Sequence, residues 1–235
     1  MNTNPSAIRI LCYGDSNVWG RSGASIERYA VNERWPGILQ EMLGNGYEII
    51  EEGLRSRTTD LDDDDPQFPG RNGLTYLRPC IESHNPLHLV VLWLGTNDLK
   101  SKFNRQPNDA VGGLRRLIDI IQQIAKQPDV APAKILIVSP PLVVEEALKV
   151  GTKFAGAPKK SQQFPALYKV LSEERNCEFI DLSDIKPGKD DGVHLDKTEH
   201  LVVAKLLYKK VIETLKQHFI KGGEENANKE KGRIF

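Results

Sequence analysis

Five short apolar runs alternate with longer amphipathic segments along this chain. Each run has the length and the β-branched or aliphatic composition of a strand, and residues 87–94 are apolar on both faces. The central strand of a parallel sheet needs two apolar faces, whereas a strand with one wet side does not. The predicted strands cover residues 7–13, 47–51, 87–94, 134–139 and 178–182. We therefore expect a parallel sheet with residues 87–94 in its middle.

The segments between the strands repeat apolar residues every three or four positions, which is typical of helices that bury one face. The predicted helices cover residues 31–43, 108–126, 162–175 and 197–219. This alternation predicts an α/β fold, a three-layer, doubly wound, flavodoxin-like arrangement around a five-stranded parallel sheet. Ligands of such folds bind beyond the carboxyl ends of the strands.

The 235 residues suit one domain, which we place at residues 1–219, and the polar stretch 220–235 predicts a flexible tail. Lys and Arg together number 32, as do Asp and Glu, so no overall basic field is present to bind nucleic acid. No apolar run reaches the ~18 residues of a membrane span, and the first residues lack a signal-peptide pattern. We expect a cytoplasmic protein without a nucleic-acid or membrane partner.

Cysteines and loops give little sign of a metal or cofactor. The three cysteines, Cys12, Cys80 and Cys177, are widely spaced and odd in number, which favours buried free thiols. The glycine-rich turn after the first strand lacks the patterns that bind dinucleotides or ATP. The acidic run 60–65 fails the spacing of a calcium-binding EF-hand loop and is interpreted as a solvated loop. We expect neither a metal nor a cofactor.

Candidate chemistry begins at the end of the first strand, in the sequence Gly14-Asp15-Ser16. Two readings of Ser16 are open, a nucleophile at the strand's carboxyl end and a serine that caps a helix. A nucleophilic serine needs a base of near-neutral pKa, and that base needs a carboxylate to orient it. Asp191 and His194, which follow the fifth strand, offer both groups.

Two further polar turns follow the second and third strands. Asn97 could donate its side-chain amide to a developing oxyanion, or only cap the next turn. Ser56 lies in a turn that could direct its backbone N–H at the same oxygen. Because all these residues follow strands, they should meet at one edge of the sheet. This convergence favours a catalytic site over separate structural roles.

These segments resemble the conserved blocks of the SGNH, or GDSL-type, ester hydrolases, and most closely the bacterial arylesterase and acyltransferase branch. The matching residues are Gly14-Asp15-Ser16 with Trp19-Gly20, Glu51 to Leu54 with Arg57 to Thr59, Gly95 to Asp98, Ser139 to Pro141, and Asp191 to His194. The chain departs at Asn17, where the family name expects leucine, and at Ser56, where many members carry glycine.

The resemblance implies a serine esterase that acts on short-chain or aryl esters, with Ser16 as nucleophile, His194 as base and Asp191 as its orienting acid. It implies an oxyanion hole formed by the N–H groups of Ser16 and Ser56 and the side chain of Asn97. It also implies acyl transfer and a homo-oligomer. A carbohydrate deacetylase and a non-catalytic flavodoxin-like binding module are the alternatives.

Three positions near the expected site stay open on the sequence alone. We count Asp15 and Trp19 as candidate substrate-binding residues, although Trp19 could equally be a core aromatic. The stretch 149–161 is either a loop over the site or a surface excursion.

Overall fold

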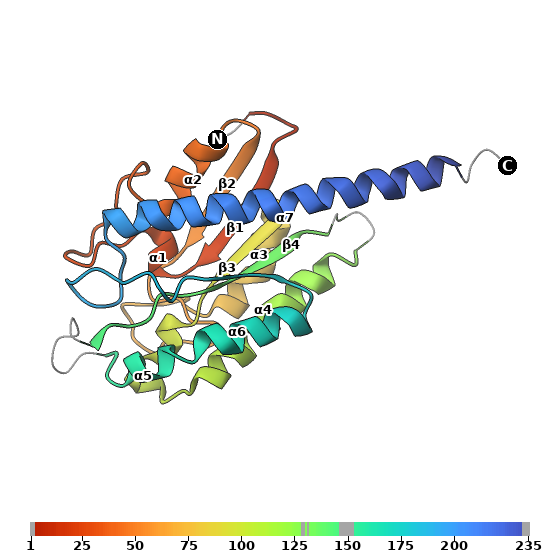
Figure 1. Ribbon diagram of the computed structural model, residues 1–235. Helices are drawn as coiled ribbons and strands as arrows, with labels where there is room; N and C mark the ends of the chain where they lie inside the picture. Colours follow the sequence, from red (N-terminus) through yellow and green to blue (C-terminus); the bar gives the residue numbers. More distant parts are fainter. Residues whose placement is uncertain (1–2, 128–129, 131, 146–152, 232–235) are drawn as a thin grey trace.

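The computed structural model describes residues 3–127, 130, 132–145 and 153–231, and side chains of the last helix as far as residue 216. Five parallel strands form one sheet in the order β2-β1-β3-β4-β5 (Figure 1). The strands are β1 (Ile8–Gly14), β2 (Tyr47–Gly53), β3 (Leu89–Trp93), β4 (Lys134–Ser139) and β5 (Glu178–Asp181). This is the flavodoxin-like strand order, so the predicted fold and the central position of residues 87–94 are confirmed.

Helices cover both faces of the sheet (Figure 1). One core joins the sheet to α2 (Trp35–Leu43) and α7 (Lys197–Lys231), and the other joins it to α3 (Gly73–His84), α4 (Pro107–Ile124) and α6 (Phe164–Glu174). Short helical segments at the strand ends are α1 (Ser16–Trp19), η1 (Thr96–Leu99), η2 (Ser101–Phe103) and α5 (Ala157–Ser161).

Alternation along the strands builds the two cores. In β1, Ile10 and Cys12 pack toward α2 and α7, whereas Leu11 and Tyr13 pack toward α3 and α4. All five residues of β3 are buried, because this strand has helices on both faces. Cys12 and Cys80 are buried and Cys177 is half-buried, all three as free thiols.

Two helices differ from the sequence-based prediction. Helix α3 was missed, because Pro79 lies inside it and its start is marked only by Asn72, whose side chain accepts a hydrogen bond from the N–H of Leu74. Helix α7 runs past the expected end at Phe219 to Lys231, since extending a formed helix carries no nucleation cost. Flexibility of residues 220–235 stays a prediction.

Within the described part of the chain, no helix is both long and apolar enough to span a membrane.

Candidate active site

Ser16 is the first residue of α1 and lies directly beyond the carboxyl end of β1. The helix is capped by Asp15, whose carboxylate accepts a hydrogen bond of 2.9 Å from the N–H of Asn17. A Cβ at Gly14 would lie 2.6 Å from the carbonyl oxygen of Trp93, so only glycine allows this turn to pack against β3. The capping role therefore belongs to Asp15, and the Ser16 side chain is available for another role.

A chain of hydrogen bonds connects Ser16, His194 and Asp191. The Oγ of Ser16 lies 2.7 Å from Nε2 of His194, and Nδ1 of His194 lies 2.6 Å from Oδ2 of Asp191. The other oxygen of Asp191 accepts the backbone N–H groups of Val193 and His194, at 3.0 and 2.9 Å. Asp191 thus fixes both the backbone and the ring of His194, which leaves Nε2 to face the serine.

Burial and hydrogen bonding act in opposite directions on these groups. Burial would raise the pKa of Asp191, but the hydrogen bonds and charge of His194 outweigh it and lower the pKa to about 2. Burial lowers the pKa of His194 below its usual 6.5, although Asp191 opposes the shift, and the positive charges of Arg21 and Lys153 lower it further. The imidazole is therefore neutral at physiological pH and can accept a proton.

The three N–H donors that the sequence predicts for an oxyanion belong to Ser16, Ser56 and Asn97. Within the described residues, the backbone N–H groups of Ser16 and Ser56 have no backbone acceptor. Asn97 donates one amide hydrogen to the carbonyl of Arg57, at 3.1 Å, and its amide has a second hydrogen. Ser56 adopts φ = +66°, a left-handed conformation that glycine adopts without strain.

The buried side chain of Arg57 supports the turn that carries Ser56. Its Nη1 donates to the carbonyl oxygen of Gly14 at 3.0 Å and also to that of Glu52. Its guanidinium lies 4.2 Å from the ring centroid of Tyr13. Arg57 thereby joins the end of β1 to the end of β2. Its backbone carbonyl also binds Asn97, which follows β3.

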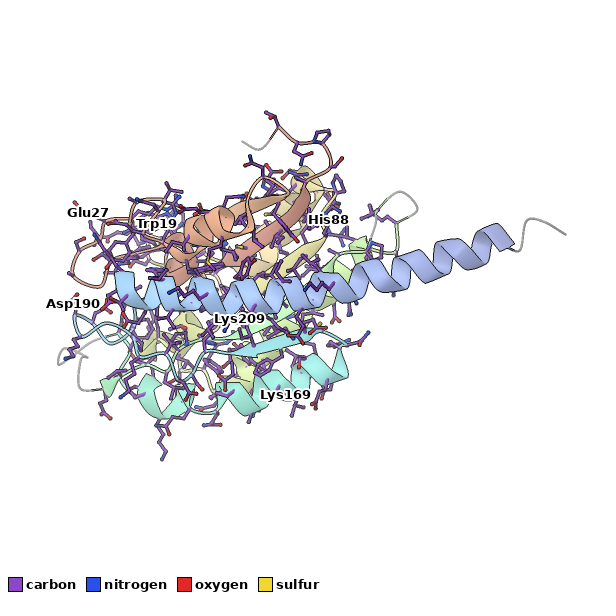
Figure 2. The ribbon with its side chains drawn as sticks, turned by 45° about the horizontal axis from the view of Figure 1, so that its top comes forward. Trp19, Glu27, His88, Lys169, Asp190 and Lys209 are labelled. Carbon is purple, nitrogen blue, oxygen red and sulfur yellow. The ribbon has the colours of Figure 1, made fainter. Side chains whose placement is uncertain are left out.

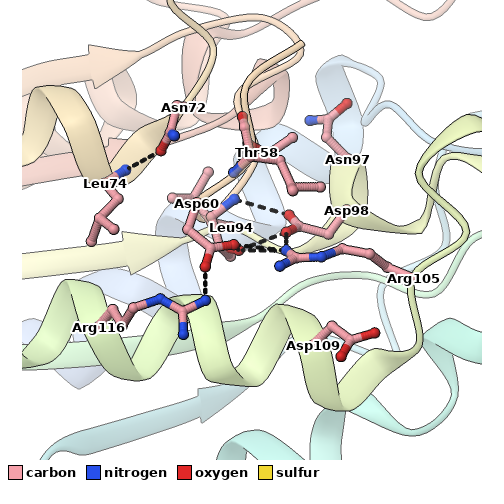
Figure 3. A network of polar contacts seen from close by, with 12 residues as sticks. Thr58, Asp60, Asn72, Leu74, Leu94, Asn97, Asp98, Arg105, Asp109 and Arg116 are labelled. Carbon is pink, nitrogen blue, oxygen red and sulfur yellow. Dashed lines mark hydrogen bonds and ion pairs between the residues drawn. The ribbon is translucent and has the colours of Figure 1, made fainter.

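A second buried network fixes the segment that carries Asn97 (Figure 3). Asp98 accepts hydrogen bonds from the N–H of Thr59 at 3.0 Å and from its hydroxyl at 2.6 Å, and pairs with Arg105 at 2.7 Å. Arg105 also pairs with Asp60, which in turn contacts Arg116 on α4. The loops after β2 and β3 are therefore held together by charged groups.

Asn17 connects α1 to the segment that carries His194. Its Nδ2 donates to the carbonyl of Val193 at 3.2 Å, and its Oδ1 accepts the N–H of Leu195 at 3.1 Å. The two bonds hold the residues on either side of His194. The departure from leucine at Asn17 thus has a structural reason.

A cavity of about 400 Å³ opens above Ser16. Ser16, Ser56, Asn97, Asp191 and His194 all line it, so the structure brings these five predicted residues together. Its other walls come from residues 21–26 and 55–68, from the segment before α5 and from the segment that carries His194. The residues are Arg21, Gly23, Ala24, Ser25, Ile26, Arg55, Phe68, Lys153, Phe154 and Val193.

The remaining predicted positions lie around this cavity in different ways. Asp15 is fully buried behind it, and burial raises the pKa of its carboxyl to about 7. Trp19 is not among the lining residues; its ring lies under the guanidinium groups of Arg28 and Arg55, at 5.4 and 5.1 Å. Trp19 therefore contacts Arg55, which lines the cavity, and does not line the cavity itself.

Residues 149–152 of the stretch 149–161 lie outside the described residues. Lys153 and Phe154 line the cavity, whereas residues 155–161 are not among its lining residues.

The acidic run 60–65 differs from the solvated loop that the sequence predicts. The carboxyl groups of Asp60 and Asp63 are only 4% and 1% exposed and pair with Arg105 and Lys102, whereas Asp64 is 99% exposed. Asp60 and Asp63 are buried because they pair with cations on the loop after β3, a long-range pairing that sequence spacing does not reveal.

One group of possible metal ligands occurs within the described residues, at Glu52, Cys80 and His84, whose ligand atoms lie within 4.8 Å of one another. Burial raises the pKa of the Cys80 thiol to about 12, so this thiol is protonated in the metal-free protein. His84 Nε2 lies 3.2 Å from Glu52 Oε1. The group is better described as a histidine–carboxylate hydrogen bond beside a protonated thiol.

A serine, a histidine and an aspartate joined in this order at the carboxyl edge of a parallel sheet are the arrangement expected of a serine hydrolase. The chain belongs to the GDSL-like lipase/acylhydrolase family, whose sequence profile matches residues 12–201. No curated protein matches the chain by sequence.

Several solved structures are similar over nearly their whole length. An aryl esterase of M. smegmatis is 34% identical, with a TM-score of 0.82, and the match covers 88% of this chain and 99% of that chain. Est24, a carbohydrate acetylesterase from Sinorhizobium meliloti, is 35% identical, with a TM-score of 0.81 and the same coverage. A putative arylesterase from Agrobacterium tumefaciens str. C58 is 34% identical, with a TM-score of 0.80 and again the same coverage.

Proposed function

We propose that this protein is a serine esterase that hydrolyses short-chain or aryl carboxylic esters through an acyl-enzyme on Ser16. The observation that carries the proposal is the hydrogen-bond chain from Asp191 through His194 to Ser16, which ends at the floor of the cavity. A binding module has no need for an activated serine beside unpaired donors.

In the first step, Oγ of Ser16 attacks the ester carbonyl carbon while Nε2 of His194 takes its proton. The carbonyl oxygen becomes an oxyanion, which accepts hydrogen bonds from the N–H groups of Ser16 and Ser56 and the amide of Asn97. Asp191 stabilises the imidazolium, which then gives its proton to the departing alcohol. Water repeats the sequence with His194 as base, releasing the acid and restoring Ser16.

The cavity walls suit this substrate class. Ile26, Phe68 and Phe154 give apolar surface for an aryl group or a short acyl chain. The similar aryl esterases support the same substrate class. An alcohol that enters the cavity in place of water would complete acyl transfer instead of hydrolysis.

Removal of an acetyl group from a carbohydrate is the second candidate, because a carbohydrate acetylesterase is as similar to this chain as the aryl esterases are. Comparing kcat/KM for p-nitrophenyl acetate with that for acetylated xylan oligomers separates the two. A higher value for the oligomers would favour the second candidate.

Labelling by a fluorophosphonate tests the proposed nucleophile. We expect rapid, stoichiometric labelling of Ser16 in the wild type and none in Ser16→Ala. Asn97→Ala should lower kcat by about 10²–10³, since its donor acts on transition-state charge. Asp191→Asn should lower kcat by about 10⁴, since the amide favours the wrong tautomer of His194. An unlabelled wild-type Ser16 would refute the proposal.

Homo-oligomerisation and a cytoplasmic location also remain proposals. Light scattering at the monomer mass over a wide concentration range would contradict the first.

A further inference from the structure

Positive charge gathers on the walls of the cavity. Arg21, Arg55 and Lys153 line it, whereas Asp191 is the one carboxylate among the described lining residues. Asp191 is already hydrogen-bonded to His194. The whole chain carries no net charge, so this excess is local.

Two of these cations have no carboxylate partner among the residues that the structure describes. Arg21 lies 3.3 Å from Asp191, but no ion pair joins Arg55 or Lys153 to an acidic group in the described ranges. The Arg55 guanidinium lies 5.1 Å from the ring centroid of Trp19, and the Lys153 Nζ lies 5.6 Å from that of Phe68. An aromatic face orients a cation without neutralising it.

More cations stand behind the same wall. Lys100 is 2% exposed, and its Nζ lies 5.9 Å from the ring centroid of Phe68. Burial and the charge of Lys153 lower the pKa of Lys100 to about 8. Burial and the charges of Arg55 and Arg57 likewise lower the pKa of Arg71.

Two acidic groups, Asp63 and Asp15, act on the pKa of Lys100 in the opposite direction. Asp63 pairs with Lys102, and burial raises the pKa of Asp15 to about 7, which weakens its charge. Cations that repel one another around an open cavity destabilise the empty protein, and a bound anion relieves that repulsion.

We propose, on the basis of the proposed esterase function, that the preferred substrates are esters that also carry an anionic group, such as a carboxylate or a phosphate. Arg55 and Lys153 bind the anionic group, while Phe68 and Phe154 contact the carbon skeleton. Arg55 and Lys153 line the same cavity as Ser16 and Ser56, so the anion binds in the cavity where the ester reacts. The two residues act as specificity-determining residues.

Two matched substrate pairs test this, one with the charge on the acyl group and one with the charge on the alcohol. The first pair is 4-nitrophenyl hemiadipate and 4-nitrophenyl hexanoate; the second is 3-acetoxybenzoate and its methyl ester. Each rate is corrected for the ester's reactivity toward imidazole. We expect kcat/KM to favour the anionic ester about tenfold in at least one pair, and the preference to fall as salt rises.

Variants that remove a positive charge then identify the residues responsible for the preference for anionic esters. Arg55→Gln and Lys153→Gln should each reduce the anionic-to-neutral ratio about threefold to tenfold, and Arg55→Lys should retain most of it. The matched control is Lys209→Gln, on the exposed face of α7 and away from the end of the molecule where Trp19 and Asp190 lie (Figure 2). This control should leave the ratio unchanged.

Equal kcat/KM for both members of both pairs would overturn the inference while leaving the esterase proposal intact. A preference that survives Arg55→Gln together with Lys153→Gln would also overturn it. If either variant fails to fold, the salt dependence of the wild type decides: a preference for the anionic ester that does not change with salt would also overturn the inference. Absence of turnover on all four esters, together with an unlabelled Ser16, would refute both proposals.

Discussion

Replacing Asn17 with leucine should loosen the segment that carries His194. The substitution removes the bonds to the Val193 carbonyl and the Leu195 N–H, and it supplies no other partner for either group. Asn17 is 2% exposed and Leu195 is fully buried, so water cannot replace these bonds without rearrangement. Each buried group left unpaired costs about 1–3 kcal/mol, so the two together predict a loss of roughly 2–6 kcal/mol in unfolding free energy.

Activity should fall as well, because a misplaced base transfers the proton poorly. A displacement of about 1 Å at a catalytic group costs on the order of 10²-fold in rate, so we expect kcat to fall between about tenfold and a hundredfold. Urea unfolding measures the first effect. Turnover of p-nitrophenyl acetate, well below the variant's unfolding temperature, measures the second.

Gln40→Leu is the matched control. Gln40 bonds to the carbonyls of Gly44 and Tyr47 and to the N–H of Ile49, at the far end of α2 from the cavity. The control should lose stability and keep its kcat. If Asn17→Leu also keeps its kcat, or loses less than about 0.5 kcal/mol, the reasoning about this connection is refuted.

Three further predictions concern the same site. Ser56→Gly should change the unfolding free energy by less than about 1 kcal/mol, because relief of the left-handed φ offsets the greater freedom of the unfolded chain. The kcat should stay within about twofold of the wild type, because the backbone N–H remains. A tenfold loss of kcat would indicate that the hydroxyl takes part in the reaction. Asp98→Asn should cost about 2–3 kcal/mol in urea unfolding and lower kcat. The amide has a donor NH₂ group in place of the oxygen that accepts the N–H of Thr59, and it lacks the negative charge that pairs with Arg105. Wild-type values for both stability and kcat would contradict the role of Asp98. The kcat/KM should rise with pH through a pKa below 6.5, as His194 loses its proton. Arg21→Gln should move that rise to higher pH, because the variant lacks a nearby cation that disfavours the imidazolium. An unmoved pH profile would contradict the contribution of Arg21.

The sequence predicts the framework of the site well, for a physical reason. Strand ends are marked by an abrupt change from apolar to polar residues, and a parallel sheet brings all carboxyl ends to one edge. Ser16, Ser56 and Asn97 could therefore be placed together without any knowledge of contacts. His194 and Asp191 follow from their proximity in the sequence and from the need of a serine for a base.

The supporting residues could not be found in this way. Asn17 bonds to a partner 178 positions away, and Arg57 acts through backbone carbonyls that any residue could present. Asp98 has the appearance of a turn residue until Thr59 and Arg105 are brought to it by the fold. Such long-range polar pairing leaves no periodic or compositional signal.

Arg57 supports the turn that carries Ser56 from behind the cavity, and this has a consequence for how the substrate selectivity of the protein can change. The reacting groups are fixed by buried contacts behind the cavity, whereas the outer wall comes from residues 23–26, Phe68 and Phe154, none of which belongs to the sheet. Phe154 packs in the core, and a side chain at Gly23 would contact Asp191, so these two positions are tied to the rest of the molecule. Ala24, Ser25, Ile26 and Phe68 are not part of the buried core. A library confined to those positions should alter which esters are accepted while most members still fold, so new selectivity can arise in small, independent steps.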